Sequence, residues 1–400
     1  MSRFLPFLLA FAGTFFFAAC VDDDDDLSPD FTIPTTYDFS RAGNSTVSFT
    51  GQTERIGMAS ELFAAFLNFS RTETDLNNMF RNPEGVDPFA SAALNAATKS
   101  VRSKVADSQA LFAANSVAAA AIKADFDGWI TAQVAEVFPN REQLASAGQP
   151  GQIADGSAVR YVNAWGLEYN QAFGKSLIGA MMYDQIANHY LTPAVLDAGS
   201  SRADNDAGIT EGSSPYTYME HRWDEAFGYL FGASATPATP LLDLGDTNDS
   251  FLGEYADRVD QDSDFAGLAA ELETAFRTGR AAIVAGDYAE RDRQAEIIRS
   301  ALEKVIVVRA IFYLKQAEIG LRAQPADFGG AFHDLSEAYG FIYSLRFIDT
   351  ADAATNSANY LTTLRNAGGN GFWDLSPDAL ASLADAIGAE YGVSVSQAAN

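Results

Sequence analysis

The sequence predicts an all-α protein. Apolar residues recur at helical spacing through most of its 400 residues, and alternation with a period of two appears briefly at residues 46–50. Apolar residues make up 48% of the chain and aromatic residues 12%, which is enough to fill a large core. Because the chain has a single cysteine, no internal disulfide can support that core, and we expect packing alone to do so.

The N-terminus has the features of an export signal. Arg3 precedes a short apolar run over residues 4–17, and small residues stand directly before Cys20. The apolar run holds about 14 residues, whereas a membrane-spanning helix needs roughly 20. We therefore predict a signal peptide over residues 1–19. The position of Cys20 resembles the lipobox of bacterial lipoproteins, which implies that Cys20 is lipidated; an ordinary cleaved signal with an incidental cysteine is the alternative.

Residues 20–36 are predicted to form a flexible acidic tether. Five successive aspartates, Asp22 to Asp26, follow the cysteine, and serine and proline residues come next. An acidic stretch in this position resembles the surface-export signal of Bacteroidetes lipoproteins; a solvated spacer without that role is the alternative. No second run of about 18 apolar residues occurs, so we expect a lipid anchor to be the only attachment to the membrane. The predicted location is the outer membrane, on its periplasmic or its outer side.

The charge of the chain argues against one class of partner. There are 53 acidic and 26 basic residues, which give a net charge of −27. A surface of this sign repels nucleic-acid phosphates, so we do not expect nucleic acid as a partner.

Helices are predicted along the rest of the chain, in one helical domain over residues 37–395. The first follows Thr53 and places Ile56, Leu62 and Phe66 on one stripe. Prolines at 139 and 193 end the second and third. A polar loop is expected at residues 200–206. The predicted helices are 54–69, about 89–137, about 157–191, 216–232, 265–285, 289–323, 327–346, 354–366 and 377–389.

The helix predicted at residues 289–323 should lie at the centre of the protein. Residues 305–314 are apolar on nearly every side, which is typical of a helix surrounded by others. Their β-branched side chains would also suit a buried strand, but both flanks consist of strong helix formers. Arg309 lies within this apolar stretch and is expected to pair with a carboxylate or with carbonyl groups, because an unpaired buried charge is unfavourable by several kcal/mol.

One phrase occurs twice in the chain. Residues 221–231 and 333–343 both read His-x-x-x-Glu-Ala, followed by an aromatic residue, glycine, an aromatic residue, an aliphatic residue and a further aromatic residue. Each copy follows a long helix with a dense apolar stretch. Self-similarity of this kind predicts a duplicated helical-bundle unit, with pseudo-repeats around residues 157–232 and 289–346.

The two phrases also suggest a metal site. A histidine and a glutamate four residues apart lie on one face of a helix, as in His221 with Glu225 and His333 with Glu337. If the two pairs meet in space, they form a mixed nitrogen and oxygen site for a divalent metal such as zinc or iron. The alternative is structural: each histidine bonds to a carboxylate, and the aromatic and glycine residues pack the helix tightly.

The phrases carry a family resemblance. The stretches at 218–229 and 37–55 resemble an uncharacterised family of helical lipoproteins from Bacteroidetes, over about residues 37–395. More distantly, the chain is similar to imelysin-like proteins, which implies two helical bundles from a duplicated unit and a link to iron uptake. The imelysin motif is Gly-x-His-x-x-Glu. Met219 and Ala331 replace its glycine, and Asp224 and Ser336 replace its glutamate, so the resemblance implies the architecture rather than peptidase activity.

A second candidate site is a calcium-binding loop. Four acidic residues match positions 1, 3, 5 and 12 of a calcium-binding loop: Asp260, Asp262, Asp264 and Glu271. Phe265 stands where such a loop needs glycine. The alternative is that an aspartate or a serine caps a helix that begins near Phe265. His189 lies at a predicted helix end, where capping is likewise the expected role.

No complete catalytic motif accompanies these features: the chain lacks His-Glu-x-x-His, Gly-x-Ser-x-Gly and a Walker loop. We therefore expect a non-catalytic binding component of the cell envelope, linked to metal and especially iron acquisition, with a TonB-type receptor or another envelope protein as partner. A structural or interaction module of an envelope complex is one alternative, and a metal-dependent hydrolase is another.

Overall fold

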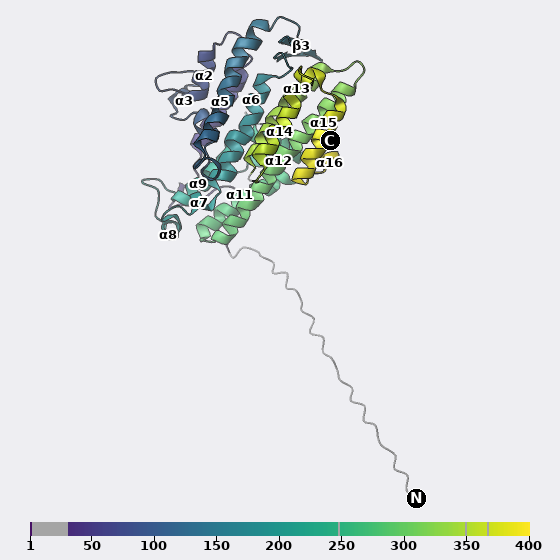
Figure 1. Cartoon of the computed structure of the whole chain (residues 1–400). Coiled ribbons are helices and arrows are strands. Elements are labelled where there is room, and N and C mark those ends of the chain that lie inside the picture. Colours follow the sequence, from purple (N-terminus) through teal and green to yellow (C-terminus); the bar gives the residue numbers. More distant parts are fainter. Residues whose placement is uncertain (2–30, 247–248, 349, 366–367) are drawn as a thin grey trace.

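The computed structural model describes residue 1 and residues 31–400, except 247–248, 349 and 366–367. The predicted signal peptide, Cys20 and most of the predicted tether lie outside the described residues. The rest is mostly helical, which confirms the predicted all-α class (Figure 1). None of the helices in the described part is long and apolar enough to cross a membrane.

The elements follow one another along the chain as follows, with α for α-helices, β for strands and η for short 3-10 and π helices. They are β1 (Ser40–Arg41), β2 (Asn44–Ser45), α1 (Thr50–Ala65), α2 (Glu73–Arg81), α3 (Ala92–Ala96), η1 (Arg102–Lys104), α4 (Gln109–Phe112), α5 (Ser116–Ala132), η2 (Gln133–Val137), η3 (Phe138–Asn140), β3 (Gly151–Asp155), β4 (Ala158–Val162), α6 (Tyr169–Leu177), η4 (Ile178–Tyr183), η5 (Ile186–Tyr190), α7 (Pro193–Leu196), α8 (Ser201–Asp206), α9 (Tyr218–Phe231), η6 (Pro240–Leu242), α10 (Leu252–Asp260), α11 (Leu268–Ala285), α12 (Tyr288–Arg322), α13 (Phe328–Ser344), η7 (Leu345–Phe347), α14 (Ala353–Arg365), η8 (Gly371–Asp374), α15 (Pro377–Tyr391) and α16 (Val395–Ala398).

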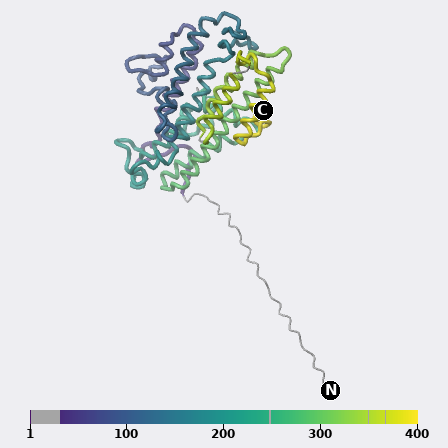
Figure 2. The backbone as a smooth tube through the Cα atoms, in the orientation of Figure 1, coloured from purple at the N-terminus to yellow at the C-terminus, as the bar shows by residue number. Residues whose placement is uncertain are grey.

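The predicted central helix is present as α12. This helix packs against α11, α13 and α15, and α13 in turn packs against α6 (Figure 1). Residues 305–311 of α12 are all buried, as their apolar character predicted. The described N-terminal segment begins beside the lower ends of α11 and α12 (Figure 2), where Arg277 Nη1 donates to the carbonyl of Pro34 at 2.6 Å.

Arg309 meets a different environment from the one predicted. Its guanidinium lies over the rings of Phe312 and Tyr313, 4.0 and 4.5 Å from their centroids. Its Nε has no hydrogen-bond partner within the described ranges. The negative faces of the rings stabilise the cation in place of a carboxylate, and the side chain is 6% exposed.

The predicted helix at 157–191 is correct only in its later part. Residues 151–162 form an antiparallel hairpin of β3 and β4, in which Asp155 pairs with Ala158, and helix begins only at Tyr169. The two-residue loop starts with Gly156 at a φ of 54°, a conformation that favours glycine and that suits a tight hairpin. The block predicted at 89–137 is also broken, because it contains α3, η1 and α4 before the longer α5.

One local prediction also differs from the structure. Residues 201–206 of the expected polar loop form the short helix α8. The alternating residues 46–50, for which no strand was predicted, lead into α1 at Thr50. The helix that begins with α6 continues through the π-helical turns η4 and η5 to Tyr190, and nearly all of its side chains are buried.

The two copies of the repeated phrase pack in the same way. Gly228 on α9 faces α1, where a β-carbon on that glycine would lie 2.4 Å from Cβ of Phe49 and 3.0 Å from Cβ of Gln52. Gly340 on α13 faces α6, where a β-carbon would lie 2.4 Å from Cβ of Lys175. Each glycine therefore permits a helix approach that any side chain would obstruct.

These contacts predict opposite effects of alanine at two helical glycines. Gly340→Ala should lower the free energy of unfolding by roughly 1–3 kcal/mol, because α6 and α13 must move apart. Gly128→Ala should raise it by roughly 0.5–1 kcal/mol, because alanine is the better helix former and open space surrounds that position on α5. Denaturant unfolding of the two variants measures both effects. Equal changes of the same sign would contradict the packing described.

Asp184 joins two parts of the fold through a buried carboxylate. It is fully buried and accepts hydrogen bonds from the backbone N–H groups of Asp107 and Ser108, at 3.2 and 3.1 Å, and from Nδ2 of Asn188. Burial raises the pKa of Asp184 from 3.8 to about 7, although these hydrogen bonds act in the opposite direction.

This shift predicts that the protein gains stability in mild acid. The folded state binds the Asp184 proton more tightly than the unfolded state, so the contribution is complete below the unfolded pKa and is lost as the pH rises through about 7. Lowering the pH from about 8 to about 5.5 should raise the free energy of unfolding by about 2 kcal/mol more in the wild type than in Asp184→Asn. Parallel pH profiles for the two proteins would contradict the assignment.

Candidate functional site

The first His/Glu pair lies on α9. Nδ1 of His221 is 2.9 Å from Oε2 of Glu211 in the preceding loop, and the imidazole packs on the ring of Tyr216. Glu225, one turn later, accepts from Nε2 of Gln52 at 3.1 Å and from the hydroxyl of Tyr190 at 3.2 Å. The histidine therefore bonds to a loop carboxylate, and the glutamate joins α9 to α1 and η5.

The second pair lies on α13 in a more buried setting. Nδ1 of His333 is 2.9 Å from Glu168 and its Nε2 is 3.7 Å from Glu337, which also lies 3.6 Å from Nζ of Lys175. Burial opposes the charged imidazole, but the hydrogen bond and the negative charge of Glu168 outweigh it, so the pKa of His333 is raised. Burial raises the pKa of the adjacent Asp334 to about 7.

The predicted four-residue metal cluster does not form. His221 and Glu225 contact Glu211, Gln52 and Tyr190, whereas His333 and Glu337 contact Glu168, Lys175 and Tyr255, so the two sets of partners have no member in common. Across the residues whose positions are described, no group of three or more His, Cys, Asp or Glu residues is arranged to hold a metal ion. The physical reason is tertiary packing: α9 packs against α1 and η5, whereas α13 packs against α12 and α6, so the two pairs lie in different helix contacts.

The repeated phrase instead has a packing role at both sites. Glu225 and Gly228 lie three residues apart on α9, and both contact Gln52. Glu337 and Gly340 have the same spacing on α13, and both contact Lys175. In each copy, glycine brings a neighbouring helix close and glutamate bonds to the side chain that this approach buries.

The predicted calcium loop is a helix cap. The carboxylate of Asp260 accepts from the backbone N–H groups of Gly267 and Ala269 at 2.9 and 3.0 Å, at the start of α11. Asp262 accepts from the N–H of Asp264, while Glu271 points from the exposed side of α11. Asp260 therefore satisfies backbone donors at the start of α11, which begins at Leu268 with Gly267 as its N-cap. At His189, Nδ1 accepts from the backbone N–H of Gln109, and burial lowers its pKa to about 4.

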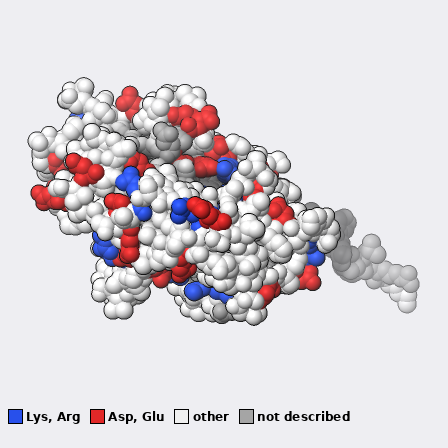
Figure 3. Space-filling view, turned by 90° about the horizontal axis from the view of Figure 1, so that it is seen from above, with Lys and Arg blue, Asp and Glu red and all other residues white. Residues whose placement is uncertain are grey.

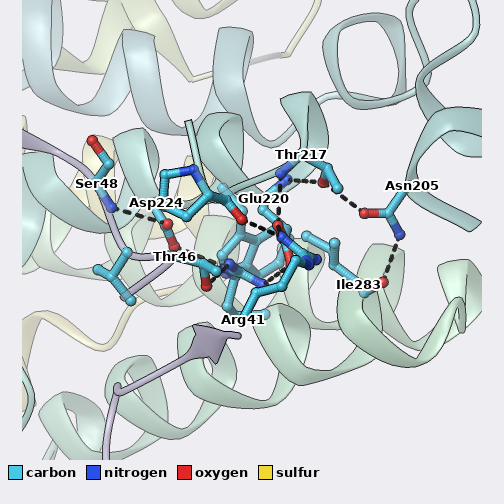
Figure 4. Close-up of polar contacts among 12 residues, drawn as sticks. Arg41, Thr46, Ser48, Asn205, Thr217, Glu220, Asp224 and Ile283 are labelled. Carbon is cyan, nitrogen blue, oxygen red and sulfur yellow. Dashed lines mark hydrogen bonds and ion pairs between the residues drawn. The ribbon is translucent and has the colours of Figure 1, made fainter. Parts of the chain in front are cut away.

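A buried ion network that sequence analysis missed lies on the other face of α9 (Figure 4). The fully buried Arg280 on α11 donates from Nε to Asp224 at 3.0 Å and from Nη1 to Glu220 at 3.1 Å. Its Nη2 donates to Oγ1 of Thr46 at 3.0 Å. Glu220 also closes the capping box of α9 with Thr217. The sequence did hold one sign of this network: Glu220 and Asp224 are four positions apart on the same helix, each next to a member of the His221 and Glu225 pair.

The same network holds the N-terminal strap, which we define as residues 37–48. Arg41 forms two hydrogen bonds to Glu220, at 2.8 and 2.9 Å. The hydroxyl of Tyr37 donates to Asp224 at 2.7 Å, the N–H of Ser48 donates to the other oxygen of Asp224, and the Tyr37 ring stacks on that of Phe227. The strap is therefore fixed on α9 immediately before α1 begins.

A polar cavity opens between α1, α9 and the segment before η1. Its volume is about 580 Å³, and we call it the His221 cavity. Its charged, amide, imidazole and phenol side chains are Gln52, Glu54, Arg55, Lys99, Lys104, Tyr190, Tyr216, His221, Arg222 and Glu225, and Ser48, Thr50 and Thr98 add hydroxyl groups. Four of these are arginine or lysine and two are glutamate, so the lining has an excess of positive charge although the chain as a whole is strongly acidic.

Several donors in the His221 cavity have no anionic partner. Arg55 is 7% exposed and donates to the carbonyls of Ser100 and Gly51. Neither Arg55 nor Lys99 forms an ion pair with a carboxylate in the described portion of the chain. Arg222 pairs with Glu225 and lies 3.6 Å from Glu211, and Lys104 lies 3.2 Å from Asp107, but the buried Nε of Arg222 has no partner among the described residues. This arrangement is suited to binding an anion.

The protein is thus helical, its N-terminal strap is bound to α9, and its His221 cavity has more cationic than anionic lining residues. The chain belongs to the family described as domain of unknown function DUF4856, whose model matches residues 34–394. No curated protein and no solved structure matches the chain.

Replacing Arg280 should test the energetic importance of the network. Arg280→Met leaves the buried Asp224 without a cation, and breaking a buried ion pair from one side is unfavourable by about 3–5 kcal/mol. Arg293→Met, which removes an exposed arginine paired with Glu290, is the matched control and should change stability by less than about 1 kcal/mol. Denaturant unfolding at neutral pH compares the two. Similar losses of unfolding free energy in both variants would show that the buried network stabilises the protein no more than the pair of Arg293 and Glu290 does.

Proposed function

We propose that this protein is a lipid-anchored, non-catalytic binding component of the outer membrane, and that the His221 cavity binds a small anionic ligand. The observation that carries the proposal is the excess of cationic side chains in a cavity of a chain whose net charge is −27. Acidic side chains are scattered over the surface seen in Figure 3. A positive cavity within such a surface selects ligands of opposite charge.

The arrangement of donors supports a carboxylate-bearing ligand. Arg55 and Arg222 present planar guanidinium groups, which match the geometry of a carboxylate, and Lys99 adds an exposed ammonium group at the edge of the cavity. Glu225 limits the positive charge by pairing with Arg222. A ligand that brings its own carboxylates would satisfy the donors that the protein leaves without an anionic partner.

We propose that the link to metal acquisition is an anion of this kind that carries the metal. Since the His/Glu pairs do not meet, we infer that a metal would arrive as a complex with a carboxylate-rich chelator rather than as a bare ion. A TonB-type receptor is the proposed partner for delivering such a complex. The alternative role, an interaction module of an envelope complex, gains support from the packing function of both His/Glu phrases.

Titration with citrate and with ferric citrate tests this proposal. Isothermal titration calorimetry at low salt should detect binding of at least one of the two anions, and added sodium chloride should weaken it. Lys99→Ala should weaken binding at least tenfold, roughly 1.4 kcal/mol, because it removes an exposed cation from the cavity. Lys304→Ala, an exposed lysine on α12 outside the cavity, is the matched control. Absence of binding, or an equal loss in the control, would overturn the proposal.

A further inference from the structure

A second cavity, of about 460 Å³, lies between α5, α13 and α14, and we call it the aromatic cavity. Five of its lining residues carry aromatic rings, and charged side chains stand beside them. Its aromatic and charged lining residues are Asp125, Trp129, Trp165, Tyr169, Tyr339, Tyr343, Arg346 and Arg365. It has no lining residue in common with the His221 cavity.

Four of the rings form a continuous wall. The ring centroids of Trp165 and Tyr339 are 6.1 Å apart, those of Tyr339 and Trp129 are 6.2 Å apart, and those of Trp129 and Tyr343 are 5.2 Å apart. The rings come from three separate segments of the chain; Trp129, Tyr339 and Tyr343 are at most 8% exposed, and Trp165 is the least buried of the four. The wall is therefore held rigidly by the fold, which is a requirement of a preformed binding site.

An arginine lies at each end of this wall. The guanidinium of Arg346 is 3.7 Å from the ring centroid of Tyr343, and that of Arg365 is 5.5 Å from Trp165. Asp125 accepts from the hydroxyl of Tyr343 at 2.8 Å and lies 3.8 Å from Arg346. The buried Nε of Arg346 has no hydrogen-bond partner in the described residues. Both donors and an acceptor are thus available around an aromatic surface.

We propose that the aromatic cavity binds a pyranose ring of a saccharide. The C–H groups on one face of such a ring form an apolar surface that packs on aromatic rings. Its hydroxyl groups lie around the edge, where they both donate and accept hydrogen bonds. Arg346 and Arg365 supply donors and Asp125 supplies an acceptor, so the cavity matches both properties of the sugar.

Asp125 makes the aromatic cavity better suited to a saccharide than to a flat aromatic acid. An aromatic carboxylate would stack on the same wall and pair with an arginine, but it would be repelled by Asp125 and could not donate to the Asp125 oxygen that the Tyr343 hydroxyl does not reach. A neutral saccharide satisfies Asp125 through a hydroxyl group. The volume of about 460 Å³ falls within the range of small-ligand cavities.

Binding can be followed by tryptophan fluorescence, because two of the four tryptophans, Trp129 and Trp165, line the cavity. The probes are cellobiose, maltose and the N-acetylglucosamine dimer, with sodium benzoate as the aromatic acid. Gly128→Phe places a ring into the cavity from a position surrounded by open space, and Arg365→Ala removes an exposed donor. Ala121→Phe, on the exposed surface of the same helix outside the cavity, is the matched control.

The proposal predicts that at least one of the three saccharides changes the fluorescence in a saturable way at millimolar concentrations. Gly128→Phe should abolish this binding, Arg365→Ala should weaken it at least tenfold, and Ala121→Phe should leave it unchanged. The proposal is overturned if none of the saccharides binds, if benzoate alone binds, or if Gly128→Phe binds as the wild type does. Thermal unfolding of each variant establishes that the fold is retained.

Discussion

Arg280, Glu220 and Asp224 meet in the interior where the N-terminal strap crosses α9 and α11. All three side chains are almost completely excluded from water. Charges in such a place are favourable only when their geometry and hydrogen bonding are nearly complete. Tyr37, Arg41 and Ser48 of the strap supply further donors, so the strap is part of the network rather than a covering over it.

The network and the His221 cavity share helix α9. The strap leads directly into α1, whose residues Gln52 and Arg55 face α9 across the cavity. Glu220 and Asp224 bind the strap from one face of α9, while His221 and Glu225 line the cavity from the adjacent face. Helix α9 therefore holds the N-terminal strap on one face and presents His221 and Glu225 to the cavity on the adjacent face.

Much of the fold follows from periodicity alone. The helix predicted at 289–323 is α12, Tyr288–Arg322, and those predicted at 216–232 and 327–346 are α9 and α13. The hairpin of β3 and β4 was missed because five-residue strands with mixed burial give a weak periodic signal beside a long apolar helix. The duplicated unit stays a prediction, although both phrases pack through a glutamate and a glycine.

The candidate site was less accessible to sequence analysis. Spacing correctly placed His221 beside Glu225 on one helix, but whether two helices meet depends on tertiary packing, and these two pairs do not. The Arg280 network joins residues up to 234 positions apart, which no local pattern reveals. Lys99 and Trp165 lie in irregular segments. Because such segments have no apolar periodicity, sequence analysis could not predict that these residues line a cavity.

Hydrogen–deuterium exchange of Arg280→Met, compared with the wild type, tests the central claim most directly. If the buried network holds the strap and thereby the wall of the His221 cavity, backbone amides in residues 37–55 lose protection in the variant, while those of α12 and α13 keep it. Unchanged protection of residues 37–55, or an equal loss of protection in α12, would contradict the account.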